Sequence, residues 1–91
     1  MGKPIDFYER KIFLRDFSLS DMKKGEHMVI KNLETKVELR QRLMDIGFVP
    51  GTKVECVLIS PFGDPKAYLV RGAVIALRKK DAATVLGVKE T

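Results

Sequence analysis

The chain has one histidine, His27, and one cysteine, Cys56, so few of its side chains suit covalent chemistry. A Cys/His nucleophilic pair needs the two groups within hydrogen-bond reach. Nothing in the sequence brings these two positions together. His27 follows Gly25 and Glu26, as in an exposed turn, whereas Cys56 lies inside an apolar run. The pattern predicts an exposed histidine, an inert buried thiol and no catalytic residues, and therefore a protein that is not an enzyme.

Metal and phosphate motifs are also missing from the sequence. Zinc sites use clustered Cys or His at short spacing, and this chain has one of each. Carboxylate pairs occur, but no spacing singles one out. The chain has no GxxxxGK[ST] or GxGxxG run, and in residues 47–51 Pro50 removes an amide that a phosphate cradle would use. We therefore expect no metal site and no cofactor.

Size and composition place the chain among ordinary globular domains. With 91 residues, 45% of them hydrophobic and 32% charged, it is long enough for one domain with a modest core. No apolar run approaches the ~20 residues that span a bilayer, and residues 1–17 lack the apolar segment of a secretion signal. A single cysteine fits a reducing compartment. These features predict a cytoplasmic protein.

The formal net charge of +5 raises the question of a nucleic-acid partner. The 17 basic residues are spread along the chain, with the tightest groups at Lys23-Lys24 and at residues 78–80. No run of aromatics alternates with basic residues, as single-strand binders use for stacking. We favour a solvated basic surface and expect no nucleic acid, with a nucleic-acid-associated module as the alternative.

The first part of the chain predicts a short turn, a strand and a helix. Ser18 to Asp21 is typical of a capped helical turn that stops at Gly25, and residues 28–33 favour a strand. Residues 35–38 match a capping box, with the Thr35 hydroxyl and the Glu38 carboxylate as its two acceptors. The helix that follows should bury one apolar stripe and end at a glycine in the left-handed conformation. The aromatic after that glycine should fold back onto the helix. The stripe is Leu39, Leu43 and Ile46, the glycine is Gly47, and the aromatic is Phe48, which should contact Leu43.

The second part of the chain predicts three strands and a final short helix. A type II turn at residues 49–52 should lead into a central strand at 52–60, with Val54, Cys56 and Leu58 on one face. A loop bounded by prolines, residues 61–65, precedes strands at 67–70 and 74–77, which reverse at 71–73. Asp81 should cap a helix at 82–86 that ends at Gly87. Short strands with few helices favour a small barrel.

Two apolar features remain that the core does not obviously need. Val37 and Met44 fall on the helix face opposite the predicted stripe. The favoured interpretation is that the N-terminal segment covers them through Phe17, Leu19 or Met22, and the alternative is an exposed ledge beside Arg40 and Gln41. Phe62 either tucks under its own loop or offers an aromatic anchor to a partner. The residues themselves leave this second choice even.

Three segments, LRQRLMDIGFVPGTKVE, SPFGDPKAYLVRG and AVIALRKKDAATVL, occur in this order and together resemble the FeoA family. The match runs from about Leu19 to Leu86. The resemblance implies a mainly β fold: a small SH3-like β-barrel with an α-helix inserted after the first strand, to which the residues add a short C-terminal helix. We therefore expect a barrel domain at residues 18–91, preceded by an N-terminal extension of uncertain structure at residues 1–17.

The resemblance also implies a role and a partner. FeoA proteins support ferrous iron transport, so the expected partner is the cytosolic, GTPase-bearing part of a FeoB-type membrane transporter. The protein would then reach the membrane only through that partner. The expected contact residues match the family's motifs at positions predicted to be exposed: Arg40, Arg42, Met44, Phe62, Asp64, Pro65 and Arg71. A module related to iron-dependent repressors, which share the barrel, stays an alternative, and the oligomeric state is left open.

Overall fold

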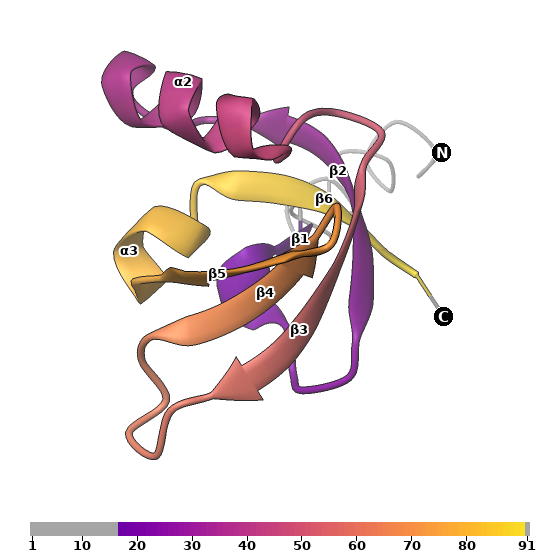
Figure 1. Cartoon of the computed structure of the whole chain (residues 1–91), viewed down its shortest axis with the longest axis vertical. Helices are drawn as coiled ribbons and strands as arrows, with labels where there is room; N and C mark the ends of the chain where they lie inside the picture. Colours follow the sequence, from indigo (N-terminus) through magenta and orange to yellow (C-terminus); the bar gives the residue numbers. More distant parts are fainter. Residues whose placement is uncertain (1–16, 91) are drawn as a thin grey trace, which may run out of the picture.

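The computed structural model describes residues 17–90; residues 1–16 and Thr91 lie outside the described part, and with them nearly all of the predicted N-terminal extension. The described chain forms six strands, two α-helices and one 3₁₀ turn (Figure 1). In chain order they are β1 (Phe17–Ser18), η1 (Leu19–Asp21), β2 (His27–Leu33), α2 (Val37–Ile46), β3 (Lys53–Ile59), β4 (Lys66–Val70), β5 (Ala73–Leu77), α3 (Lys79–Ala82) and β6 (Val85–Glu90).

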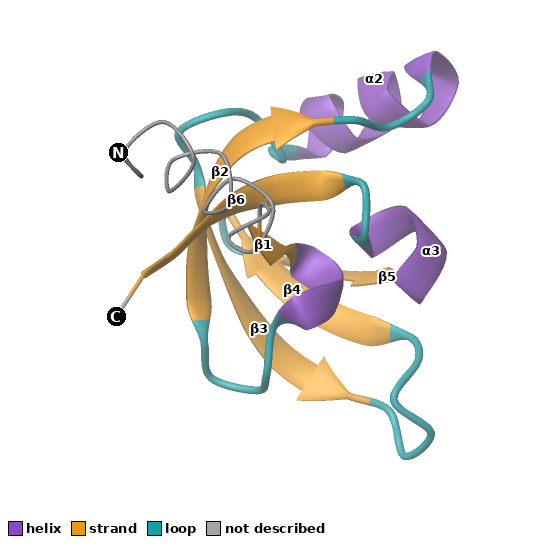
Figure 2. Ribbon diagram, turned by 180° about the vertical axis from the view of Figure 1, so that it is seen from behind, coloured by secondary structure: helices purple, strands orange, loops and turns teal. Residues whose placement is uncertain are grey.

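All six strands belong to one antiparallel sheet with the order β1-β6-β2-β3-β4-β5. The sheet curls around a single core, with α2 above it and α3 at its side (Figures 1 and 2). The predicted mainly β fold with an inserted helix is confirmed; the helix follows β2, because the two-residue β1 comes before the strand that the sequence indicated as the first. The sheet does not close within the described residues, because β1 and β5 stand at its two ends.

The start of α2 differs from the predicted capping box. The helix begins at Val37 with Lys36 as its N-cap, and no side chain caps it. The Thr35 hydroxyl, which the sequence assigned to the helix, lies 2.7 Å from the Thr84 hydroxyl instead. Thr35 is buried, so its hydroxyl needs a partner. The Thr84 hydroxyl donates to the Asp81 carbonyl, so the Thr35 hydroxyl is the donor of the bond to Thr84. Side-chain capping was the wrong prediction because the helix begins one residue later than the capping box requires, with Lys36 at the N-cap.

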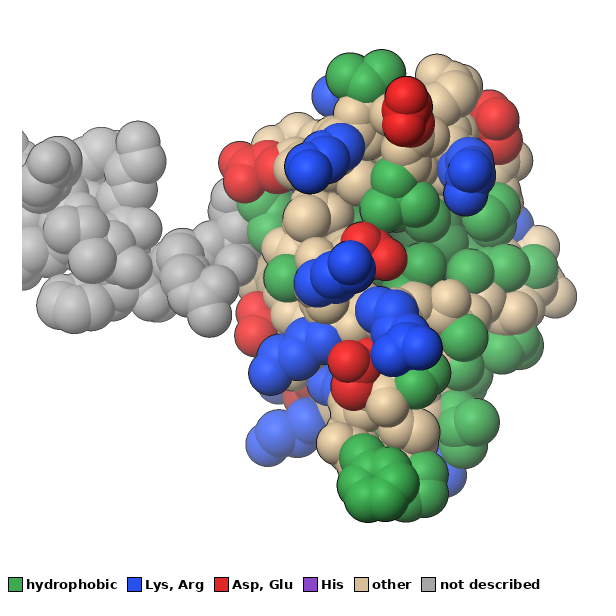
Figure 3. Space-filling view, turned by 90° about the vertical axis from the view of Figure 1, so that its left-hand side faces the viewer, with side chains coloured by type: hydrophobic (Ala, Val, Ile, Leu, Met, Phe, Trp, Pro, Cys, Tyr) green, Lys and Arg blue, Asp and Glu red, His purple; other side chains and the backbone are tan. Residues whose placement is uncertain are grey.

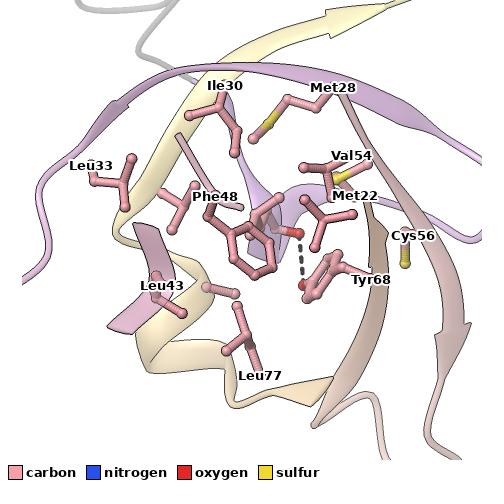
Figure 4. Packing of buried hydrophobic residues seen from close by; sticks show 14 residues of the cluster. Met22, Met28, Ile30, Leu33, Leu43, Phe48, Val54, Cys56, Tyr68 and Leu77 are labelled. Atoms are coloured by element: carbon pink, nitrogen blue, oxygen red, sulfur yellow. Dashed lines mark hydrogen bonds between the residues drawn. The ribbon is translucent and has the colours of Figure 1, made fainter. Parts of the chain in front are cut away.

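The end of α2 follows the sequence closely. Gly47 has a φ of 134°, and the amides of Gly47 and Phe48 both donate to the Leu43 carbonyl, at 3.1 and 2.9 Å. Phe48 then packs with Leu43 in the core (Figure 4), as a Schellman ending predicts. The predicted stripe is only partly buried, because Leu39 is half-buried and Ile46 is 38% exposed.

The strand β3 is central, between β2 and β4, as predicted, but its alternation breaks. The register with β4 shifts between Cys56 and Leu58. A β-bulge of this kind adds one residue to a strand and changes which side chains face inward. Leu58, predicted to face the core, is therefore 58% exposed, and Ile59 packs against the core instead.

The C-terminal segment corrects a second prediction. The short helix α3 lies at Lys79–Ala82 rather than at 82–86, and the chain continues into β6. Gly87 does not end a helix: it sits in β6 between Phe17 of β1 and Ile30 of β2. A Cβ atom there would collide with the carbonyl oxygen of Val29. Gly87 is needed because two backbones approach closely.

The core lies inside the curled sheet and is closed by α2 and the segment around η1. Its largest fully buried side chains include Tyr68, Phe48, Leu19 and Met22 (Figure 4). The Tyr68 hydroxyl donates a 3.0 Å hydrogen bond to the Leu19 carbonyl, which gives the buried phenol its partner. Cys56 is fully buried among these residues, as the sequence predicted.

Candidate interaction surface

The loop between β3 and β4 carries the most exposed aromatic of the described chain. Phe62 is 96% exposed, and a hydrophobic tip stands at the bottom of Figure 3, where Figure 1 places this loop. Hydrogen bonds from the Ser60 amide to the Pro65 carbonyl (3.2 Å) and from the Gly63 amide to the Ser60 carbonyl (2.8 Å) hold the loop's shape. The sequence left open whether Phe62 tucks under its own loop or is exposed, and in the structure its ring is in solvent.

Two side chains tie this loop to the body of the domain. The Lys66 ammonium donates to the carbonyls of Ser20 and Met22, at 2.9 and 2.7 Å. An Asp64 carboxylate oxygen accepts the Lys79 amide at 2.8 Å, at the start of α3. Asp64 and Lys66 therefore fix both sides of the loop base, and Pro65, which is half-buried, sits between them. Phe62 is presented on an anchored support.

A basic groove opens beside the loop. It has a volume of about 680 Å³ and is lined by Asp64, Arg78, Lys79, Lys80 and Ala83. Figure 3 shows Lys and Arg side chains gathered in the middle of this face, next to hydrophobic ones. The predicted contact set included Asp64 but missed the three basic residues, although the run Arg78-Lys79-Lys80 was visible in the sequence. A run of basic residues does not by itself show which of them share a groove.

The outer face of α2 is the second candidate region. Val37 is 73% exposed and Met44 is 37% exposed. The favoured interpretation, in which Phe17, Leu19 or Met22 covers this face, is wrong: Leu19 and Met22 are fully buried in the core, and Phe17 packs against it. These residues lie at the core because β1 pairs with β6 and η1 contacts β6 and α3.

Arg40 and Met44 lie one helical turn apart on α2 and line a small groove together. Its volume is about 250 Å³, and its other lining residues are Asn32, Leu33 and Pro50. Arg42 is also exposed, but it lies about 200° around the helix from each of them. The structure thus brings two of the three predicted helix residues together and separates the third.

Arg71 is held by the domain itself. It occupies the β4–β5 turn with a φ of 49°, and its side-chain stem lies over Gly47: a Cβ on Gly47 would come within 2.9 Å of Arg71 Cδ. Its guanidinium approaches the Thr52 hydroxyl at 3.4 Å. Arg71 therefore packs the turn against the end of α2, a structural role that the sequence did not indicate.

The predicted contact residues do not form one continuous patch. Figure 1 places α2 and the β3–β4 loop at opposite ends of the molecule. Phe62, Asp64 and Pro65 belong to the loop end, whereas Arg40 and Met44 belong to the helix end. A single small partner surface would contact one end or the other, so the two groups are separate candidates.

The remaining titratable groups give little support to chemistry at these surfaces. Burial raises the pKa of the Cys56 thiol, which keeps it protonated and unreactive. His27 is half-buried at the start of β2 rather than in an exposed turn, and its Nε2 lies 3.5 Å from a Glu55 carboxylate oxygen. Within residues 17–90, no group of three or more His, Cys, Asp or Glu side chains could hold a metal ion. Among the same residues, no helix is long and apolar enough to cross a membrane.

Comparison with known proteins places the chain in a family. The model of the FeoA domain matches residues 17–89. A fusion of Fe(2+) transport protein A with the Fe(2+) transporter FeoB, from Porphyromonas gingivalis, is 33% identical over 67 residues. That match takes in 74% of this chain but 8% of the fusion protein, so the chain spans less than a tenth of its relative's length.

Solved structures agree with this assignment. Iron(II) transport protein A from Clostridium thermocellum is 37% identical, with a TM-score of 0.73 over 79% of this chain and 45% of that one. The zinc complex of FeoA from Stenotrophomonas maltophilia, described as a prokaryotic SH3 domain protein, is 26% identical, with a TM-score of 0.72 over 81% of this chain and 95% of that one. A manganese-dependent transcriptional repressor, 12% identical with a TM-score of 0.74 over 84% of this chain and 37% of that one, shares the fold alone.

The mainly β sheet with its inserted helix, the match over residues 17–89 and the similarity to FeoA structures with an SH3-like fold lead to one conclusion: this chain belongs to the FeoA domain family, whose members take part in ferrous iron transport.

Proposed function

We propose that this chain is an accessory domain of ferrous iron transport that binds the cytosolic, GTPase-bearing part of a FeoB-type transporter and modulates it by contact. The observation that carries the proposal is the Porphyromonas gingivalis relative, in which a homologous segment and FeoB form one polypeptide. In this proposal the domain is cytoplasmic, catalyses no reaction and holds no iron. It reaches the membrane only through its partner.

The loop that carries Phe62 is the favoured contact surface. Truncating an aromatic at the centre of an interface typically costs about 2 kcal/mol or more. The Phe62 loop is anchored by Lys66 and Asp64, so docking would lose little loop entropy. Arg40 and Met44 at the helix end form the second surface, where the charge of Arg40 would mainly speed association. Arg42 and Arg71 are weaker candidates on geometry.

The test is binding of the purified cytosolic domain of the transporter, measured by surface plasmon resonance at two salt concentrations. Phe62→Ala should weaken binding about thirtyfold or more, through faster dissociation. Arg40→Glu should slow association, most strongly at low salt. The control is Val88→Ala, since Val88 is 52% exposed on β6 and belongs to neither surface.

Two results would contradict the proposal in different ways. If wild-type protein shows no binding to the transporter domain in the presence or absence of a GTP analogue, the partner is wrong. If wild-type protein binds and both variants bind equally well, the partner stands and the contact surface lies elsewhere. Circular dichroism of each variant should match wild type, because Phe62 and Arg40 are exposed.

The nucleic-acid alternative has a separate test. Binding through phosphate contacts weakens steeply between 50 and 200 mM salt. We expect weak binding of mixed DNA or RNA oligonucleotides at low salt and none at physiological salt, measured by fluorescence anisotropy. Sequence-dependent submicromolar binding at physiological salt would replace the transporter proposal with the alternative.

A further inference from the structure

The outer edge of β5 is a free edge of the sheet. Ala73–Leu77 pairs with β4, and β5 is the last strand in the sheet order. The turn before it has positive φ at both central residues, Arg71 (49°) and Gly72 (82°), the geometry of a two-residue type I′ hairpin. In such a hairpin Val70 and Ala73 form a hydrogen-bonded pair.

This register determines which backbone groups of β5 point outward. Hydrogen-bonded and non-hydrogen-bonded pairs alternate along antiparallel strands, so Ala73, Ile75 and Leu77 bond to β4. Val74 and Ala76 therefore turn their amides and carbonyls away from β4. Within residues 17–90, no other strand or loop bonds to these groups.

The side chains leave this edge open. Val74 is 62% exposed and Ala76 is also exposed, whereas Leu77 is buried and Ile75 packs against the core. Soluble proteins usually protect a sheet edge with a charged residue, a proline or a bulge. The sequence Ala-Val-Ile-Ala-Leu has no charge or proline, and its pairing with β4 is regular. The edge is available as a template for another strand.

Basic residues follow the edge at one end. Arg78, Lys79 and Lys80 come directly after Leu77. Within residues 17–90 none of these three side chains forms an ion pair, and the Asp64 carboxylate accepts the Lys79 backbone amide. At the other end, the Arg71 guanidinium approaches the Thr52 hydroxyl, next to β3 and on the opposite side of β4 from this edge.

We propose that the β5 edge binds an extended segment of a partner protein by strand addition, and that this segment has an apolar centre and acidic residues at the end that meets Arg78–Lys80. Backbone bonds to Val74 and Ala76 would supply the affinity, and Arg78–Lys80 would select the acidic end. The proposal rests on the proposed function in that it assumes a protein partner, but its backbone contacts are on the β5 edge and not on Phe62, with the groove of Arg78–Lys80 between the two.

Charge favours an acidic segment over a second copy of this chain as the occupant. Two β5 strands paired in parallel would bring residues 78–80 of both copies together, which is unfavourable. Two strands paired in antiparallel fashion would leave residues 78–80 of each copy without an opposite charge, which an acidic segment would supply.

The probe for the test is a synthetic peptide with the sequence Val-Thr-Val-Thr-Val between two aspartates at each end. We expect it to shift the NMR signals of Val74 and Ala76 and to slow exchange of these two amides about tenfold or more, since both become hydrogen-bonded. A peptide with lysines in place of the aspartates should cause neither change.

A matched pair of variants isolates the backbone bonds. Ala76→Pro removes an outward amide without removing a bond to β4, and proline is tolerated on edge strands. It should weaken binding of the acidic peptide about tenfold, whereas Ala76→Val, which keeps the amide, should bind like wild type. If Ala76→Pro does not fold, the double variant Arg78→Glu/Lys80→Glu serves instead: it should lose the acidic peptide and gain the basic one.

Three outcomes would overturn the inference. The first is an acidic peptide that leaves Val74 and Ala76 unperturbed at millimolar concentration. The second is a set of shifts confined to the groove of Asp64 and Ala83, which would indicate electrostatic binding alone. The third is concentration-dependent protection of the two amides with dimer formation in sedimentation, which would make a second copy the occupant. In each case, binding of the transporter domain that still depends on Phe62 would leave the proposed function intact.

Discussion

Phe48 and Phe62 stand in similar local sequences and have opposite environments. Phe48 lies between Gly47 and the Val49-Pro50-Gly51 turn, and Phe62 lies between Pro61 and Gly63. Phe48 is fully buried and Phe62 is 96% exposed. An aromatic beside proline and glycine is therefore not assigned to the core or to the surface by its neighbours in sequence.

The difference comes from what the two turns are attached to. The turn after Phe48 is bonded to a central strand: the Gly51 amide donates to the Ile30 carbonyl at 2.7 Å, and the Ile30 amide donates to Thr52 at 2.9 Å. The Phe48 amide is also bonded to Leu43. The loop of Phe62 is bonded to itself and, through Asp64, to α3. The first turn faces the barrel interior, and the second projects beyond the ends of β3 and β4 (Figure 1).

The largest expected effect comes from truncating the two aromatics. Phe48→Ala should lower the free energy of unfolding by about 3–5 kcal/mol, because it removes a buried ring and leaves a cavity. Phe62→Ala should change it by no more than about 0.5 kcal/mol, since the ring is in solvent. Urea denaturation of both variants measures the difference. Similar losses for the two variants would show that Phe62 belongs to the core.

The glycines beside the two aromatics provide a second, smaller contrast. Gly47→Val should destabilise the domain by more than about 1 kcal/mol, because its φ is 134° and its new Cβ would press on the stem of Arg71. Gly63 also has a positive φ, of 86°, but the space around it is open, so Gly63→Val should cost less. Thermal denaturation compares the two.

The contact with Arg71 can be separated from backbone strain by a double-mutant cycle. Arg71→Ala removes the stem that a residue 47 side chain would meet. Gly47→Val should therefore cost less in the Arg71→Ala background than in wild type. Equal costs in the two backgrounds would mean that strain at residue 47 accounts for the whole effect.

A pH experiment tests how completely the core that contains Phe48 and Tyr68 excludes water. Burial raises the pKa of Tyr68 above its usual value near 10. The unfolded chain therefore loses the phenol proton at lower pH than the folded chain. Stability from the neutral phenol is fully present below about pH 10 and is lost as pH rises above it.

We expect the free energy of unfolding, measured by urea denaturation, to fall between pH 9 and pH 11. Tyr68→Phe should show a smaller fall over the same range, although it is less stable at pH 8 because the Leu19 carbonyl loses its donor. An unchanged slope in Tyr68→Phe would assign the alkaline loss to other groups.

The smallest expected effect is that of metal ions. Because residues 17–90 offer no group of three metal-ligating side chains, micromolar Fe²⁺ or Zn²⁺ should leave the melting temperature of wild type and of Phe62→Ala unchanged. A ligand at a hundred times its dissociation constant would add about 2.7 kcal/mol to the free energy of unfolding. A metal-dependent rise that His27→Ala abolishes would reveal a site beside Glu55.

Local sequence determined the order of elements and several of their ends. Gly47 ended α2, and Gly51 made the turn at residues 49–52, because positive φ is accessible to glycine at little cost. The central place of β3 followed from apolar residues on both of its faces. The three sequence segments that resemble the FeoA family were sufficient to indicate the fold and the field of function, and both were confirmed.

Tertiary structure decided the features that depend on segments distant in sequence. The Thr35 hydroxyl pairs with Thr84 rather than capping α2, and Gly87 serves a close approach to Val29 rather than ending a helix. The bulge after Cys56 turned Leu58 outward. Burial of Phe48, exposure of Phe62 and the free edge of β5 belong to the same class. Each depends on which strands become neighbours, and a single segment cannot encode its own neighbours because burial is a property of the packed chain.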